Sequence, residues 1–167
     1  MTRLDIVIDA IATARGYTEQ LLEKTSTEDW FRQPNEGVTH IAWQVGHLAF
    51  AEYAIALRRV RGRRPEDAAL LPDGFETLFG RLSVPQADAA VYPSADVIRE
   101  VLDRVHRQAL VELRALPNEE LDAATTDPPH PMHKTKFGAL QWCAQHEFLH
   151  AGEIALLRRL LGSDALW

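Results

Sequence analysis

Three of the seven histidines in this chain have a spacing that could do chemistry. In the stretch "QHEFLHAGEIALLRRLLG", His146 and His150 stand four residues apart. Residues at that spacing lie on one face of an α-helix, one turn apart, so both imidazoles could bind one metal ion. A third histidine, His47, follows Gly46 in "THIAWQVGHLAFAEYA". Three neutral nitrogen donors from two helices would leave part of the coordination sphere open for water or substrate, as catalytic metal sites do.

The stretch from His146 to His150 reads HEFLH and so also matches the H-E-x-x-H motif of zinc proteases. The metzincin form of that motif would place Gly at 153 and His at 156, where this chain has Glu153 and Leu156. Only 17 residues follow His150, too few for the later helix from which other zincins take a ligand. An all-helical chain also lacks the edge strand that aligns a peptide. The sequence therefore argues against a protease.

Three other side chains of the same stretch could take part in the chemistry. Glu147 lies about 100° around the helix from His146 and could be a general base on metal-bound water, or a solvated charge. Glu153 lies within about 20° of the His146 direction, where it could orient an imidazole or extend a polar stripe. Cys143 could be a fourth ligand, although a free cysteine is commonly a small core hydrophobe.

The remaining histidines are expected to lie apart from the metal. His40 stands about 10.5 Å along the helix axis from His47, too far to share one ion easily, and is expected to serve the start of the helix. His130 and His133, in "PPHPMH", fall in a loop rich in proline and are expected to be exposed, although they could line the mouth of a site.

Aromatic and basic residues surround these histidines in the sequence. Four aromatic residues are expected to form the apolar wall of any pocket: Trp43, Phe50, Trp142 and Phe148. The basic cluster consists of Arg58, Arg59, Arg61, Arg63 and Arg64. Arg58 stands about 16.5 Å along the helix axis from His47. Because cations are favourable at a helix C-terminus, this cluster is expected to serve the helix end and not a substrate.

Four helices must position these residues. Apolar residues recur at spacings of three and four in the ranges of about 2–24, 39–61, 95–116 and 136–161, and no range alternates as a strand. Gly62, Pro117 and Gly162 stand where helices would end. About thirty residues separate the second and third helices, enough to cross a bundle. The sequence predicts an all-α fold, a four-helix bundle with a long crossover between helices two and three, in a single domain spanning residues 1–167.

Composition limits the class of protein. The net charge is −6, which argues against nucleic acid as a partner. No apolar run approaches the roughly 18 residues that a membrane span needs. Asp5 and Asp9 interrupt the apolar N-terminus, which therefore lacks the uncharged core of a signal peptide. Cys143 is the single cysteine and excludes an internal disulfide. These features predict a soluble cytoplasmic protein that acts on a small molecule.

The chain resembles the DinB/YfiT-like superfamily of metal-binding four-helix bundles. The resemblance is carried by "WQVGHLAFAEYAIALRR", "FETLFGRLS", "YPSADVIREVLDRVHRQALVELRALPNEELD" and "QHEFLHAGEIALLRRLLG" and covers nearly the whole chain. It implies that His47, His146 and His150 bind a divalent ion, nickel or zinc. It also implies that helices two and three are parallel and that the chain forms a homodimer. Several members transfer or isomerise substrates with low-molecular-weight thiols such as bacillithiol or mycothiol.

Three functions stay open from the sequence, which leaves undecided whether the chain is an enzyme. A metal ion at an open site would lower the pKa of a bound water or thiol. A thiolate would then give S-transfer or isomerisation, which the resemblance favours. A hydroxide would give hydrolysis of an amide or ester, with Glu147 as candidate base. Alternatively, the metal could staple two helices in a non-catalytic binding module. Imidazole ligands make magnesium and calcium poor candidates and leave the identity of a transition metal open.

Overall fold

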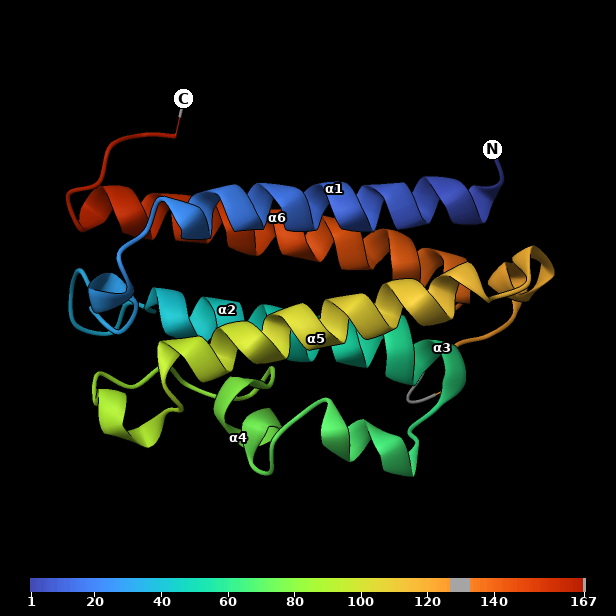
Figure 1. Ribbon diagram of the computed structural model, residues 1–167, viewed down its shortest axis with the longest axis horizontal. Coiled ribbons are helices and arrows are strands. Elements are labelled where there is room, and N and C mark those ends of the chain that lie inside the picture. Colours follow the sequence, from blue (N-terminus) through green and yellow to red (C-terminus); the bar gives the residue numbers. More distant parts are fainter. Residues whose placement is uncertain (127–132, 167) are drawn as a thin grey trace.

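The computed structural model describes residues 1–126 and 133–166. Four long helices form a bundle (Figure 1): α1 (Arg3–Glu23), α2 (Ile41–Glu52), α5 (Ala95–Arg114) and α6 (Lys136–Leu160). A π-helical segment (Tyr53–Arg58) and a short α3 (Arg59–Arg61) continue the path of α2. The described part of the chain contains no β-strand, only an isolated bridge between Ala124 and Thr135. The predicted all-α four-helix bundle is confirmed.

The helices begin and end where their sequences provide caps. The Ser94 and Thr135 side chains accept hydrogen bonds from the first turns of α5 and α6. His40 plays the same part for α2, through a 3.1 Å bond from a backbone N–H to its Nδ1. Gly62 and Gly162 follow the ends of the α2–α3 path and of α6 with φ angles of 84° and 98°, which favour glycine. The prediction that His40 serves the helix start is thereby confirmed.

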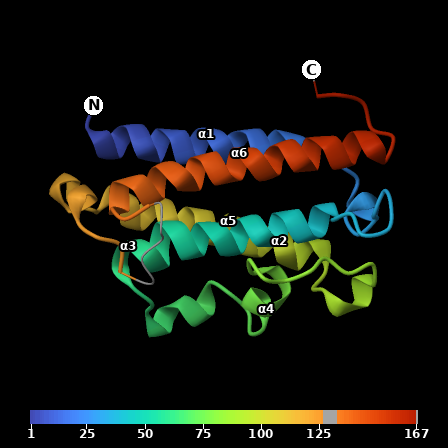
Figure 2. The same ribbon diagram turned by 180° about the vertical axis from the view of Figure 1, so that it is seen from behind.

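The helices pack as two parallel pairs. In Figures 1 and 2, α1 and α6 lie side by side and run in one direction, while α2 and α5 lie side by side and run in the opposite direction. Residues 62–94 join α2 to α5 and contain the short α4 (Phe75–Phe79). This crossover lies against the side of α2 and α5 that faces away from α1 and α6 (Figure 1). A long connection of this kind is what allows consecutive helices to be parallel.

The crossover explains why α2 is buried on almost every side. Eleven of its 12 residues are buried, whereas α5 shows one buried stripe at spacings of three and four. Phe75 and Phe79 of α4, both at most 1% exposed, fix the crossover to the bundle. No helix among the described residues has an apolar stretch long enough to cross a bilayer.

Candidate metal centre

The structure brings the three predicted histidines together. His47 comes from α2, and His146 and His150 come from consecutive turns of α6; one ring nitrogen of each lies within 4.8 Å of the other two. The ring centroids are 4.5, 4.7 and 5.2 Å apart. Two nitrogens bound to one zinc or nickel ion lie at most about 4 Å apart, so small ring rotations would place all three on one ion. We call these residues the histidine cluster.

The ring of His47 is held from two sides. Its Nδ1 lies 2.7 Å from the carbonyl oxygen of Phe79, to which it donates a hydrogen bond. Its Nε2 then carries the lone pair that a metal needs. Gly46 makes this contact possible, because a Cβ there would fall 2.3 Å from the Phe79 ring. Trp43 stacks on His47 with centroids 4.9 Å apart and planes 7° apart. The segment that approaches Gly46 closely is therefore α4 of the crossover.

His150 is oriented by an amide. Its Nδ1 donates to Oε1 of Gln44 at 2.5 Å, and Nε2 of Gln44 donates to Oε2 of Glu153 at 2.5 Å. Glu153 itself lies 3.7 Å from His150 Nδ1. Of the two possibilities for Glu153, the structure favours orientation of an imidazole, acting through Gln44. Gln44 was not among the predicted site residues, although it precedes His47 by three residues and so shares its face of α2.

His146 lies beside aromatic rings. Trp142 meets it edge-on at a centroid distance of 5.7 Å, and His133 stacks on Trp142 at 5.1 Å. His133 was expected to be exposed; the structure half-buries it against this tryptophan. His130 lies outside the described residues. Among the described residues, no hydrogen-bond acceptor fixes the His146 ring as Phe79 and Gln44 fix the other two rings.

Burial keeps the histidine cluster uncharged. Burial lowers the pKa of His47. Burial and the neighbouring His47 lower the pKa of His146 to about 4. Burial and the two other histidines lower the pKa of His150 to about 3. At neutral pH all three rings are therefore in the neutral state that binds a metal ion. The chemistry of this donor set, three imidazoles without a carboxylate, fits zinc or nickel.

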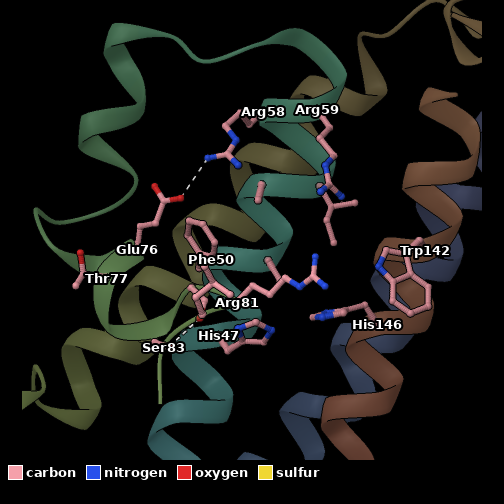
Figure 3. A pocket seen from close by; sticks show the side chains of 15 residues that line it. His47, Phe50, Arg58, Arg59, Glu76, Thr77, Arg81, Ser83, Trp142 and His146 are labelled. Atoms are coloured by element: carbon pink, nitrogen blue, oxygen red, sulfur yellow. Dashed lines mark hydrogen bonds and ion pairs between the residues drawn. The ribbon is translucent and has the colours of Figure 1, made fainter. Parts of the chain in front are cut away.

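A cavity of about 840 Å³ opens beside His47 and His146 (Figure 3). Its size lies within the range of about 300–1,000 Å³ that is usual for small-molecule sites. Phe50 and Trp142 line it, as predicted. Phe148 does not, so this prediction was wrong: its side chain is 44% exposed on α6, against the ring of Tyr17.

The basic cluster is divided between two roles. Arg58 and Arg59 line the cavity, so the expectation that the whole cluster serves only the helix end is wrong. Arg61 instead forms structural ion pairs with Asp67 at 2.7 Å and with Glu112 at 2.8 Å. The distance along one helix axis gives no information about the crossover. Residues of the crossover line the cavity together with residues of α2 and α6, and this places Arg58 and Arg59 in its wall.

The structure does not bring Glu147 to the histidine cluster. Its side chain is 4% exposed, and Arg15 donates to its two oxygens from Nε at 2.6 Å and Nη2 at 3.3 Å. The solvated surface charge considered for Glu147 is therefore wrong. The general-base role has no support from the geometry, because a carboxylate held by a buried guanidinium is not free to take a proton from water.

Glu147 belongs instead to a second polar group, with one residue from each long helix. Arg15 (α1) donates to Glu52 (α2) at 2.9 Å, and the other oxygen of Glu52 lies 2.7 Å from Nδ1 of His106 (α5). We call Arg15, Glu52, His106 and Glu147 the ionic cluster. Burial opposes the charge on Arg15, yet its two carboxylate neighbours raise its pKa. Burial also opposes the charge on Glu52, but Arg15 and His106 lower its pKa.

Cys143 lies in the core and not in the histidine cluster. Its side chain is 4% exposed, and burial, together with Glu52 and Glu147, raises the pKa of its thiol. A protonated, buried thiol is a small apolar group. The expectation that Cys143 is a core residue is confirmed, and the fourth-ligand possibility finds no support in the position of the sulfur.

The comparisons with known proteins agree with this geometry. A family model described as the DinB superfamily matches residues 10–154, which include the whole histidine cluster. The fold is similar to that of YfiT from Bacillus subtilis, with a TM-score of 0.60 over 96% of this chain and 89% of that chain, at 18% identity. That protein is described as "a probable metal-dependent hydrolase with an unusual four-helix bundle topology". Among curated proteins, none matches this chain.

Proposed function

The chain belongs to the DinB superfamily, and from this premise we propose that it is a divalent-metal enzyme whose histidine cluster holds the ion. The observation that carries the proposal is the convergence of three neutral imidazoles beside an open cavity. A closed site with a fourth protein ligand would instead support a non-catalytic module, and Cys143 does not supply that ligand. Three imidazoles suit a divalent transition metal, and among these we propose zinc or nickel because of the family resemblance.

Neighbouring residues orient two rings of the histidine cluster for metal binding. His47 and His150 each use Nδ1 in a hydrogen bond, which leaves Nε2 to bind the ion. His47, His146 and His150 would hold the ion, which would supply an open coordination position and lower the pKa of a water or thiol bound there. Phe50 and Trp142 give the adjoining cavity apolar walls, against which the body of a substrate could pack.

We propose transfer or isomerisation with a low-molecular-weight thiol as the reaction. A thiol ionises more easily than water and needs no protein base. The cavity lining described in the structure holds one carboxylate, Glu76, and it is already engaged by Arg58 and Arg63. The thiolate would attack an electrophilic carbon, a bond from that carbon to its leaving group would break, and the thiol proton would pass to solvent. Hydrolysis is the second candidate because the structurally similar YfiT is described as a metal-dependent hydrolase.

Metal content of the purified protein tests the site. We expect about one zinc or nickel ion per chain, and less than a tenth of that in the His47→Ala variant, because two imidazoles hold such ions far more weakly than three. His40→Asn is the matched control: it removes an imidazole from the start of the same helix but keeps a side chain that can cap it. Equal metal content in the His47→Ala and His40→Asn variants would refute the proposed site.

A second assay separates the reactions. The metal-loaded protein is given an electrophile such as monochlorobimane with bacillithiol, mycothiol or no thiol, and in parallel an activated ester without thiol. Acceleration that requires both metal and thiol supports the transferase. Ester hydrolysis without thiol, lost in the His47→Ala variant, supports the hydrolase. A protein that holds its metal and accelerates none of these reactions would favour the binding module.

A further inference from the structure

The cavity beside the histidine cluster is positively charged, although the chain as a whole carries −6. Within residues 1–126 and 133–166, the charged side chains that line it are those of Arg58, Arg59 and Arg81, which are cationic, and that of Glu76, which is anionic. A concave, partly apolar site with an excess of one charge raises the local concentration of ligands of the opposite charge. The excess therefore points to an anionic ligand.

Arg81 is the guanidinium that is available to such a ligand. Glu76 lies 3.5 Å from Arg58 and 3.3 Å from Arg63, so the single carboxylate of the lining is shared by two other arginines. The Arg81 side chain is exposed, and in the described part of the chain it forms no ion pair and no side-chain hydrogen bond. Its five N–H donors are therefore open to carboxylate or phosphate oxygens, which a guanidinium binds in a bidentate manner.

The position of Arg81 is tied to the histidine cluster. It follows Gly80 at the end of α4, in a turn where Ser83 Oγ donates to the Gly80 carbonyl at 2.7 Å. Trp43, which stacks on His47, donates from its indole nitrogen to the same Ser83 oxygen at 3.0 Å. In Figure 3 the Arg81 side chain reaches across the cavity toward the side formed by His146 and Trp142. A ligand bound by Arg81 would therefore extend toward the metal site.

Much of the remaining lining is apolar and would receive the body of the ligand. Phe50, Ala54 and Ile55 form one side, along α2 and the π-helical segment that continues it. Leu82, next to Arg81, lines the rim with 93% of its surface exposed. An aliphatic side chain this exposed gains most when an apolar ligand covers it.

We infer that the substrate or co-substrate is a small molecule with an apolar body and a carboxylate or phosphate group, and that Arg81 binds this anionic group. The inference rests on the proposed function, since it names the class of molecule that would reach the metal. Arg58 and Arg59 lie farther along the α2–α3 path (Figure 3) and add positive potential without being the main contact.

Calorimetric titration with benzoate, phenyl phosphate and neutral benzamide tests this inference. The protein is used as purified, and its metal content is measured on the same sample. We expect benzoate or phenyl phosphate to bind more tightly than benzamide, and Arg81→Gln to weaken binding of that anion about fivefold or more. Arg107→Gln is the matched control, because Arg107 is exposed on α5 and does not line the cavity. Metal content should be the same in both variants.

The comparison of benzoate with phenyl phosphate shows which anionic group the site prefers. Arg81→Lys keeps the charge and should retain more affinity than Arg81→Gln; equal losses would overturn the argument from charge. The inference is also overturned if benzamide binds as well as the anions, or if Arg81→Gln behaves like Arg107→Gln. Loss of anion binding in Arg81→Gln from a protein without metal would uphold the anionic subsite while refuting the metal enzyme.

Discussion

The histidine cluster and the ionic cluster share α2 and α6, yet their polar atoms are used in opposite ways. In the ionic cluster, the donors of Arg15 and the carboxylate oxygens of Glu52 and Glu147 all have partners inside the bundle. In the histidine cluster, hydrogen bonds engage the outer nitrogens of two rings, and one nitrogen of each ring faces the other two. The first arrangement is closed and structural; the second leaves three ring nitrogens close enough together to bind one ion.

The closed cluster also helps to position the open one. Glu147 follows His146 directly, and Glu52 stands five residues after His47. When Arg15 binds both carboxylates, it fixes the rotation of α6 and of α2 about their axes. That rotation is what directs His146 and His150 toward His47. A buried charged network is costly to desolvate, so its contribution here is best understood as specifying one arrangement of the helices.

The largest effect that would test this contrast is expected from Arg15→Met. The substitution leaves two buried carboxylates without a cation, and removal of one partner from such a network typically costs about 3–5 kcal/mol of unfolding free energy. Urea denaturation followed by circular dichroism measures it. Arg3→Met is the control on the same helix, because the ion pair of Arg3 with Asp122 is exposed to solvent. A stability equal to that of the control would show that the ionic cluster does not hold the bundle.

A smaller effect, on metal affinity and not on folding, is expected from Gln44→Leu. This change removes the amide that joins His150 to Glu153 but leaves all three ligands in place. Loss of such an orienting partner usually weakens metal binding about 10–100-fold. Competition with a chromophoric chelator gives the affinity. Gln108→Leu serves for comparison, since Gln108 bonds Glu112 on α5. If the two variants bind metal equally well, Gln44 does not orient the ligand.

Local patterns in the sequence were sufficient for the helices and for the three residues of the histidine cluster. The spacing of apolar residues predicts all four helices, and the i, i+4 spacing of His146 and His150 predicts half of a metal site. His47 could be added because it is a histidine on a strongly apolar helix, where a single polar ring needs a reason to be buried. These spacing patterns involve only residues within a few helical turns of one another, so they can be recognised in the sequence.

The contacts of the charged residues near the histidine cluster could not be predicted, because their partners come from distant parts of the chain. Arg15 and Glu147 are 132 residues apart, and a charged residue beside His146 gives no sign of an arginine on α1. The distance along α2 suggested that Arg58 lies away from the site, but Arg58 and residues of the crossover line the same cavity. Arg81 was not considered, since only the path of the crossover places it there. The roles of Arg15, Arg58 and Arg81 depend on where the fold places them and cannot be inferred from their residue type.

The smallest effect on metal affinity is expected from lowering the pH. Because burial lowers the pKa of His146 to about 4 and of His150 to about 3, protons compete weakly with the metal. Protonation of His146 and His150 should therefore lower the metal affinity less than about threefold between about pH 7 and pH 5, and substantially only below about pH 4. Histidines with ordinary pKa values near 6.5 would each lower the metal affinity roughly tenfold per pH unit below about pH 6.5. Chelator competition at each pH distinguishes the two cases.

The same pKa values set the sign of the effect of pH on the metal-free fold. In the unfolded chain these histidines take up protons as the pH falls through about 6.5, whereas the folded protein resists until about pH 4. The unfolding free energy of the metal-free protein should therefore decrease as the pH falls from about 6.5 to about 4. His146→Leu should remove part of that decrease. If the slope is unchanged in this variant, the buried rings of the histidine cluster are not its source, and the contrast between an uncharged open cluster and a charged closed one would fail.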